Sequence, residues 1–209
     1  DSAKPQSLSD DRVQVIYQDR AGIFWFGTFR GGLNRFDAQT GQFTAYRHDP
    51  ANPDSLSDDR VWAITEDLAG NFWIGTNNGL DKFDRASGIF THYRHDPELP
   101  GSLSDNQARW LFVDSGGTLW VSTKKGVNEF HADTGTFTRY AQDFTRPDSL
   151  SYDTTYKIWE DHRKRLWIGA NATDTAGLNL FDRERGMFTH FAHDPSRLTS
   201  ISHNDIRAL

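Results

Sequence analysis

The sequence predicts an all-β protein built as a β-propeller of four-stranded antiparallel blades. Three observations predict this fold: one tryptophan-containing phrase occurs four times, its copies are evenly spaced, and apolar residues inside each copy alternate with period two. The tryptophans Trp25, Trp73, Trp120 and Trp167 lie 48, 47 and 47 residues apart. Four strands in a repeat of about 40 to 50 residues are typical of a propeller blade.

The second repeat shows the expected elements most clearly. Short alternating apolar segments predict strands at 61–67, 72–76, 80–84 and 89–94. Turn residues separate them at 69–71, 77–79 and 85–88, and a linker rich in Pro, Ser and Asp follows at 95–106. No segment carries an apolar stripe of helical period and length, so we expect no helices.

A Ser-Leu-Ser step opens each repeat, at residues 7, 55, 102 and 149, and a variant begins at 200. We therefore place blades at 7–54, 55–101, 102–148 and 149–199, with the start of a fifth at 200–209, so that 1–209 forms a partial propeller. Seven blades would need roughly 330 residues, and we expect this segment to belong to such a ring. Two alternatives stay open: two copies pair across open blade faces, or four blades close on themselves.

The repeated tryptophan is expected to pack between neighbouring blades. Trp73 lies in the middle of a strand, and burying an indole of roughly 200 Å² stabilises the fold by about 5 kcal/mol as an upper estimate. Gly75 follows two residues later, and the third repeat has Ser122 in its place. This position is therefore expected to require a small residue rather than a positive φ.

Composition excludes several classes of function. The formal net charge is −6 and no basic run occurs, which argues against nucleic-acid binding. The absence of cysteine excludes a disulfide framework, a thiolate metal site and a Cys nucleophile. No stretch approaches about 18 consecutive apolar residues, so a membrane would be reached only through segments outside this sequence. We predict no cofactor.

Binding residues are expected where the repeats differ, because shared positions serve the shared structure. In an up-and-down blade, the loop between the second and third strands lies on the same face as the long linkers. That loop and the start of the first strand vary from repeat to repeat. The candidates there are Arg30, Trp62, Asn77, Asn78, Arg109, Trp110, Lys124, Lys125 and Tyr156. Aromatic faces with Asn, Lys and Arg donors suit a sugar or an anionic oligosaccharide; the alternative is that these loops are merely solvated and variable.

The repeated acids and histidines are expected to be structural. His48, His95 and His193 occur in similar His-Asp-Pro turns of the first, second and fourth repeats, one per blade, so they would not converge on a metal. The Asp that follows the first strand recurs in every repeat and is expected to accept backbone N–H bonds in the next turn. Neighbouring acids such as Glu66 and Asp67 point to opposite faces of a strand and do not form a catalytic dyad. We predict neither catalytic nor metal-binding residues.

The repeated phrase resembles the two-component regulator propeller repeat. The residues that carry the resemblance in the second repeat are Asp67, Gly70, Trp73, Ile74, Gly75, Thr76, Gly79, Leu80, Phe83 and Asp84. The resemblance implies a seven-bladed propeller from the periplasmic sensor part of a hybrid histidine kinase or a diguanylate cyclase receptor, anchored in the inner membrane and binding a glycan or other small ligand. It also implies self-association as a receptor dimer.

Two other functions remain possible on this fold. A propeller-type lyase or hydrolase would need acidic or basic groups converging on the axis, but the variable column at the start of the first strands supplies no carboxylate, which argues against hydrolysis by paired acids. A protein-interaction scaffold without a small ligand is the third possibility.

Overall fold

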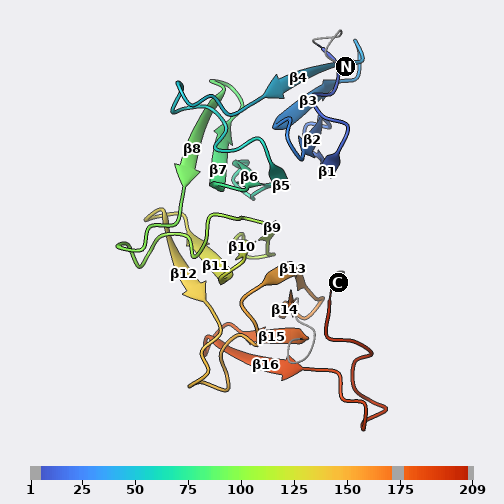
Figure 1. The fold of residues 1–209 in the computed structure, drawn as a ribbon, viewed down its shortest axis with the longest axis vertical. Coiled ribbons are helices and arrows are strands. Elements are labelled where there is room, and N and C mark those ends of the chain that lie inside the picture. The colour runs from blue at the N-terminus through green and yellow to red at the C-terminus, as the bar shows by residue number, and fades with distance from the viewer. Residues whose placement is uncertain (1–5, 171–176, 207–209) are drawn as a thin grey trace. The chain divides into compact units, whose positions relative to one another are not determined.

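The computed structural model describes residues 6–170 and 177–206, and within these ranges it contains sixteen β-strands and no helix. The strands form four sheets of four, as the repeat predicts (Figure 1). In every sheet, strands that follow one another in sequence are antiparallel neighbours, so each blade is a simple meander. No helix of the described residues is long and apolar enough to cross a membrane.

The contacts divide the chain into two compact units, described here one at a time. Unit 1 comprises Asp1–His95 with Asn106–Leu111, and unit 2 comprises Asp96–Asp105 with Phe112–Leu209. The strands of the first two blades are β1 (Val13–Gln18), β2 (Phe24–Thr28), β3 (Leu33–Asp37), β4 (Gln42–Tyr46), β5 (Val61–Glu66), β6 (Phe72–Thr76), β7 (Gly79–Asp84) and β8 (Ile89–Tyr93). The expected bounds in the second repeat are thus met to within one residue.

The third and fourth sheets repeat the pattern. Their strands are β9 (Trp110–Val113), β10 (Leu119–Thr123), β11 (Gly126–His131), β12 (Thr136–Tyr140), β13 (Thr155–Glu160), β14 (Leu166–Ala170), β15 (Leu178–Asp182) and β16 (Met187–Phe191). The loop expected between the second and third strands of the fourth repeat, 171–177, falls outside the described residues except for Gly177. Arg207, at the start of the first strand of the fifth repeat, also falls outside them.

Two of the four repeated tryptophans, Trp25 and Trp120, pack against the following blade inside their unit, as expected. Trp25 of the first blade is almost completely buried, with its ring 4.9 Å from that of Phe72 and 5.9 Å from that of Phe83, both in the second blade. In unit 2, Trp120 packs 5.5 Å from Phe181 of the following blade. The same apolar interface is therefore built inside each unit.

A carboxylate fixes each tryptophan from the preceding turn. Asp19 accepts the N–H groups of Ala21 and Ile23 through Oδ1, at 3.0 and 2.9 Å, and the indole N–H of Trp25 through Oδ2, at 2.9 Å. The equivalent indole bonds run from Trp73 to Asp67, from Trp120 to Asp114 and from Trp167 to Asp161, at 2.8 to 3.0 Å. The turn-building role predicted for this Asp is confirmed, and the indole bond explains why Asp and Trp recur together.

The small residue after the tryptophan makes room for the next blade. A Cβ at Gly75 would lie 2.4 Å from the carbonyl oxygen of Ala108, and one at Gly27 would lie 2.5 Å from Cγ1 of Val61. Neither glycine has a positive φ. The requirement is therefore for small size, as predicted.

The Ser-Leu-Ser step attaches each linker to its own blade through its leucine side chain and a hydrogen bond from its backbone. Leu56 is completely buried, and the N–H of Ser57 donates to Asp81 Oδ2 at 2.8 Å. The backbone N–H of Phe90 in β8 donates to the carbonyl of Asp54, at 2.9 Å, so the linker also runs beside the outer strand. These bonds hold the variable loop face in a fixed position relative to the sheet.

Candidate ligand site

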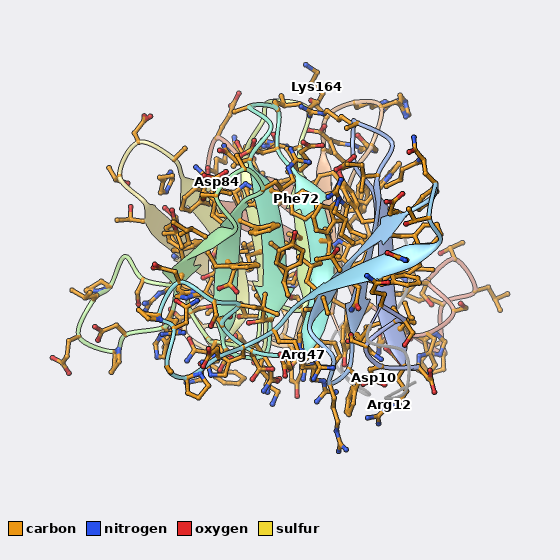
Figure 2. All side chains as sticks on the ribbon, turned by 90° about the horizontal axis from the view of Figure 1, so that it is seen from above. Asp10, Arg12, Arg47, Phe72, Asp84 and Lys164 are labelled. Atoms are coloured by element: carbon orange, nitrogen blue, oxygen red, sulfur yellow. The ribbon has the colours of Figure 1, made fainter. Side chains whose placement is uncertain are left out.

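One face of unit 1 gathers the linkers and the loops between second and third strands, as the meander requires. The N–H of Phe29, after β2, donates to the carbonyl of Arg12 at 3.0 Å, and the N–H of Gly32 donates to the carbonyl of Asp59 at 2.9 Å. The loop of the first blade is thereby tied to the linker that enters the second. Figure 2 shows Arg12, with Asp10 and Arg47, at the opposite end of the unit from Asp84, which ends β7.

A β-bulge lies at the start of the innermost strand in three of the blades. The register shifts between Val13 and Val15 in β1, between Val61 and Ala63 in β5, and between Thr155 and Lys157 in β13. The residue inside each shift is the variable one: Gln14, Trp62 or Tyr156. Because a bulge re-aims one side chain without disturbing the rest of the ladder, this position can vary freely on a constant sheet.

Cations and aromatic rings alternate across this face of unit 1. The guanidinium of Arg60 lies 4.0 Å from the ring centroid of Phe29 and 4.0 Å from that of Trp62. Arg12 lies 4.1 Å from Phe29, and Arg109 lies 5.8 Å from Trp62. We call the set Arg12, Phe29, Arg60, Trp62 and Arg109, together with Arg30 at 5.6 Å from Phe29, the arginine–aromatic cluster. Each stacked pair is worth about 0.5 to 2 kcal/mol.

The electrostatics of this cluster are dominated by positive charge. Burial, followed by the charge of Arg109, lowers the pKa of the Arg60 guanidinium; Asp58 opposes this shift, and Arg12 and Arg30 add to it. Asp10 lies 3.7 Å from Arg12 Nε. Arg30 and Arg60 form no ion pair within 4 Å among the described residues, in a chain whose net charge is −6.

Two buried donors of the cluster have no hydrogen-bond acceptor among the described residues. They are Nε of Arg60 and Nε1 of Trp62. Buried polar atoms without a partner are rare in proteins and call for an explanation such as a bound ligand or ion. Since both atoms are donors, the partner that would satisfy them is an acceptor.

The structure brings together three of the residues predicted from the sequence. Arg30, Trp62 and Arg109 meet in the cluster. Asn77 and Asn78 lie in the adjoining loop between β6 and β7, where the N–H of Asn77 donates to the carbonyl of Arg60 at 3.1 Å. The side-chain amide of Asn78 donates to the carbonyl of Ser57 at 3.3 Å, so one of its donors holds the linker. Trp110 is half-buried at the start of β9.

The remaining three candidates belong to unit 2. Lys124 and Lys125 are exposed in the loop between β10 and β11, and the N–H of Lys125 donates to Oγ1 of Thr123 at 3.0 Å. Tyr156 is half-buried at the bulge of β13. They occupy the same repeat positions as the residues of the cluster.

Sequence reasoning missed Arg12, Phe29 and Arg60. The signal was present, because the position before the inner strand reads Arg12, Arg60, Gln107, Thr154 and Asp205 in successive repeats. That column varies as strongly as the next one. This position lies at the end of a linker in which Asp and Ser residues recur from repeat to repeat, so its own variation was overlooked.

A cavity of about 550 Å³ opens elsewhere in unit 1. Its lining includes Trp25, Tyr46 and an ion-pair network in which Arg85 contacts Asp19 at 2.9 Å and Glu66 at 2.7 Å. The equivalent network in unit 2 joins Arg183 to Asp114 and Glu160, at 2.6 and 2.8 Å. Because the same three groups recur between paired blades, we interpret them as interblade contacts.

Comparison with protein families matches the two component regulator propeller model at residues 7–30, 55–78 and 102–125. These segments cover the Ser-Leu-Ser step, the inner strand, the Asp–Trp turn and the second strand of the first three repeats. Comparison with curated proteins gives no match.

Solved structures share the fold. The extracellular domain of the putative hybrid two component system BT4673 from B. thetaiotaomicron is 18% identical with a TM-score of 0.72, and the match covers 98% of this chain and 26% of that one. The corresponding domain of BT3049 from the same organism is 24% identical with a TM-score of 0.55, covering 97% and 31%. Virginiamycin B lyase from Staphylococcus aureus is 18% identical with a TM-score of 0.64, covering 91% and 59%.

The chain thus spans about a quarter of the BT4673 domain, and identities this low establish the propeller fold alone. The matched segments carry the same Asp, Trp and small-residue positions that build the blade interfaces here. Three of the four repeats of this protein therefore match the two component regulator propeller model, on a fold shared with other propellers.

Proposed function

We propose that the chain is a non-catalytic sensing module of a bacterial signal-transduction receptor. It would lie outside the cytoplasm and bind a glycan or other small ligand on the linker face. The match to the two component regulator propeller model supports the signalling role, and the likeness to extracellular domains of putative hybrid two component systems supports the location. The observation that carries the proposal is the arginine–aromatic cluster, a singular feature on a repeated scaffold.

The cluster suits recognition better than catalysis. Its charged groups are guanidiniums, which stay protonated and do not act as general acids or bases at neutral pH. The flat faces of Phe29 and Trp62 offer apolar contact, and the arginines offer directed donors. Binding of a ligand across both blades would change how firmly they are held, which is how a sensor would transmit occupancy.

A ligand screen tests the proposal. Purified protein is heated with a panel of neutral and acidic oligosaccharides, and each mixture is analysed for product. We expect one class of sugar to raise the melting temperature with no product formed. Trp62→Ala should abolish the shift, whereas Trp159→Ala, which removes a tryptophan that is 46% exposed in β13, should preserve it.

Two other results would replace the proposal. Conversion of a sugar to product would identify a propeller enzyme, such as the lyase whose fold is shared. The absence of any sugar response, together with a stable complex with another protein, would favour an interaction scaffold.

A further inference from the structure

We propose that the arginine–aromatic cluster is an oxyanion site, which binds the carboxylate, sulfate or phosphate group of a ligand. The inference rests on the proposed sensing function and specifies the chemistry that the linker face recognises. Its central residue is Arg60, which is stacked between Phe29 and Trp62.

Stacking positions the guanidinium for this task. The ring centroids of Phe29 and Trp62 each lie 4.0 Å from the central carbon of the Arg60 guanidinium, which donates its hydrogen bonds in its own plane. Contact with two rings restricts the positions that the guanidinium can take. An ordered fork of this kind binds a planar carboxylate or a sulfate through two parallel hydrogen bonds.

Two arginines of the cluster have no ion-pair partner among the described residues. Arg12 lies 3.7 Å from Asp10, whereas Arg30 and Arg60 form no ion pair within 4 Å in the part of the chain that the structure describes, and Asp58 acts on Arg60 only from farther away. Arg85 and Arg183, by contrast, each hold two carboxylates within 3 Å in their interblade networks. Arg85 and Arg183 also lie over rings, at 5.0 Å from Phe72 and 5.8 Å from Trp120, so the feature that distinguishes Arg60 is the lack of an ion pair with any described residue.

The unsatisfied donors agree with this interpretation. Nε of Arg60 and Nε1 of Trp62 are buried and lack acceptors among the described residues. A neutral sugar hydroxyl would satisfy one such donor, whereas an oxyanion offers several lone pairs and also neutralises charge. A single bound oxyanion thus accounts for the absence of an ion pair at Arg60 and for the missing acceptors.

The test titrates purified protein calorimetrically at low ionic strength with four probes: glucuronate, a sulfated monosaccharide, inorganic phosphate and neutral glucose. We expect binding of anionic probes, weakening as salt is added, and no binding of glucose. Preference for the sugar acids would assign the oxyanion to a glycan, whereas equal or tighter binding of phosphate would assign the site to the free anion; both support the site.

Two variants assign the binding to this cluster. Arg60→Gln, which introduces the residue that the third repeat has at this position, should weaken binding about tenfold or more. Arg60→Lys should also weaken it, because a lysine retains the charge but loses the planar fork. Arg163→Gln, which removes an exposed arginine from the β13–β14 turn, is the matched control and should bind as the parent does. If Arg60 variants unfold, the exposed Arg12→Gln provides the same test.

Glucose binding as tightly as glucuronate, unchanged anion binding in both Arg12→Gln and Arg60→Gln, or no anion binding at all would overturn the inference. Failure of the sensing proposal is separately visible. If acidic sugars bind through Arg60 and are converted to product, the oxyanion site stands while the sensor does not. If neutral oligosaccharides alone bind through Trp62, the sensor stands and the oxyanion site does not.

Discussion

Lys164 occupies a backbone position that the other repeats give to glycine. Its φ is 61°, and it is the only non-glycine residue with a positive φ among those the structure describes. Gly22, Gly70 and Gly117 hold the same place in the β1–β2, β5–β6 and β9–β10 turns, with φ between 83° and 89°. A side chain in this conformation costs about 1 to 2 kcal/mol.

We therefore predict that Lys164→Gly stabilises the protein. The relief of strain is partly offset by the greater freedom of glycine in the unfolded chain, so a net gain of about 0.5 to 1 kcal/mol is expected. Urea unfolding measures it. Lys164→Ala, which keeps a Cβ at the strained position, should give no comparable gain, and an unstabilised glycine variant would contradict the argument.

His92 and Asp81 form a hydrogen-bonded pair that is specific to the second blade, because the other blades have a different residue in place of Asp81. The third-strand position reads Asn34, Asp81, Asn128 and Asn179, so only the second repeat carries an acid there. Asp81 is completely buried, and its Oδ1 lies 2.7 Å from Nδ1 of His92. Nε2 of His92 lies 2.9 Å from the carbonyl of Pro53, so a protonated ring donates on both sides.

This geometry predicts a pH-dependent contribution to stability. The hydrogen bond to Asp81 raises the pKa of His92, although burial and Arg94 oppose the shift. A group whose pKa is raised on folding stabilises fully below its unfolded pKa of about 6.5 and loses that contribution as the pH rises through the folded value. Stability should therefore fall as pH increases from about 6 into the alkaline range.

Thermal unfolding across this range measures the effect. Asp81→Asn, which restores the residue of the other repeats, and His92→Gln should each flatten the profile. The double variant should be no flatter than either single one, because both remove the same interaction. An unchanged slope in Asp81→Asn would disprove the assignment.

At the scale of the strand, the small-residue position after each tryptophan gives a graded prediction. Gly75→Ala brings a Cβ to 2.4 Å from the backbone oxygen of Ala108, whereas Gly27→Ala meets the side chains of Val61 and Val15 at 2.5 and 2.6 Å. The backbone of Ala108 is held by a hydrogen bond from its N–H to the carbonyl of Thr76, at 3.0 Å, so its oxygen has little freedom, but a valine side chain can shift. We expect Gly75→Ala to destabilise by about 2 to 3 kcal/mol and Gly27→Ala by less, compared by denaturant midpoints. Equal losses of stability in the two variants would show that the space available for the new Cβ does not decide the cost.

Elements were predictable from the sequence because their causes are local. Alternation marks the strands, and Gly70, with a φ of 83°, shows why a glycine ends the turn before β6. Even the interblade role of Trp25 followed from its recurrence in the middle of a strand. Each of these features repeats, so one sequence supplies four independent observations of it.

The site was less predictable because it depends on what does not repeat. Variation indicated Trp62 and Arg109, but it could not show that Phe29 lies between Arg12 and Arg60. That contact joins a loop of one blade to the linker of the next, and the distance between them is set by the packing of two sheets. Residues that only tertiary packing brings together have no characteristic spacing in the sequence.

At the scale of the whole molecule, the repeats differ in pairs as well as singly. Arg85 and Glu66 occur together in the second repeat, and Arg183 and Glu160 in the fourth. The first and third repeats have Ala38 and Ala132 where these arginines stand. The acceptors in their turns, Asp19 and Asp114, are the partners that the arginines reach in the preceding blade. The structural group that repeats is therefore a pair of blades joined by an ion-pair network.

The Asp–Trp turns make acid sensitivity a property of the whole chain. Asp19, Asp67, Asp114 and Asp161 share one environment: burial would raise the pKa of each carboxyl, but hydrogen bonds from the tryptophan indole and from backbone N–H groups outweigh it and lower the pKa. A carboxyl whose pKa is lowered on folding stabilises above its unfolded value of about 3.9 and loses that contribution as the pH falls through the folded value. Four such groups add their contributions, because each sits in a separate turn.

We therefore predict a steep loss of stability below about pH 4, shared among the blades. Asp67→Asn should lower the free energy of unfolding at neutral pH, because it removes the charged acceptor of the Trp73 indole, and it should make the acid limb shallower. Asp133→Asn, in the exposed turn between β11 and β12, is the control and should leave both unchanged. Denaturant titrations at several pH values measure the slopes. An acid limb that keeps its full steepness in Asp67→Asn would mean that the loss arises outside these turns, and the carboxylate would then matter to the tryptophan only for its geometry.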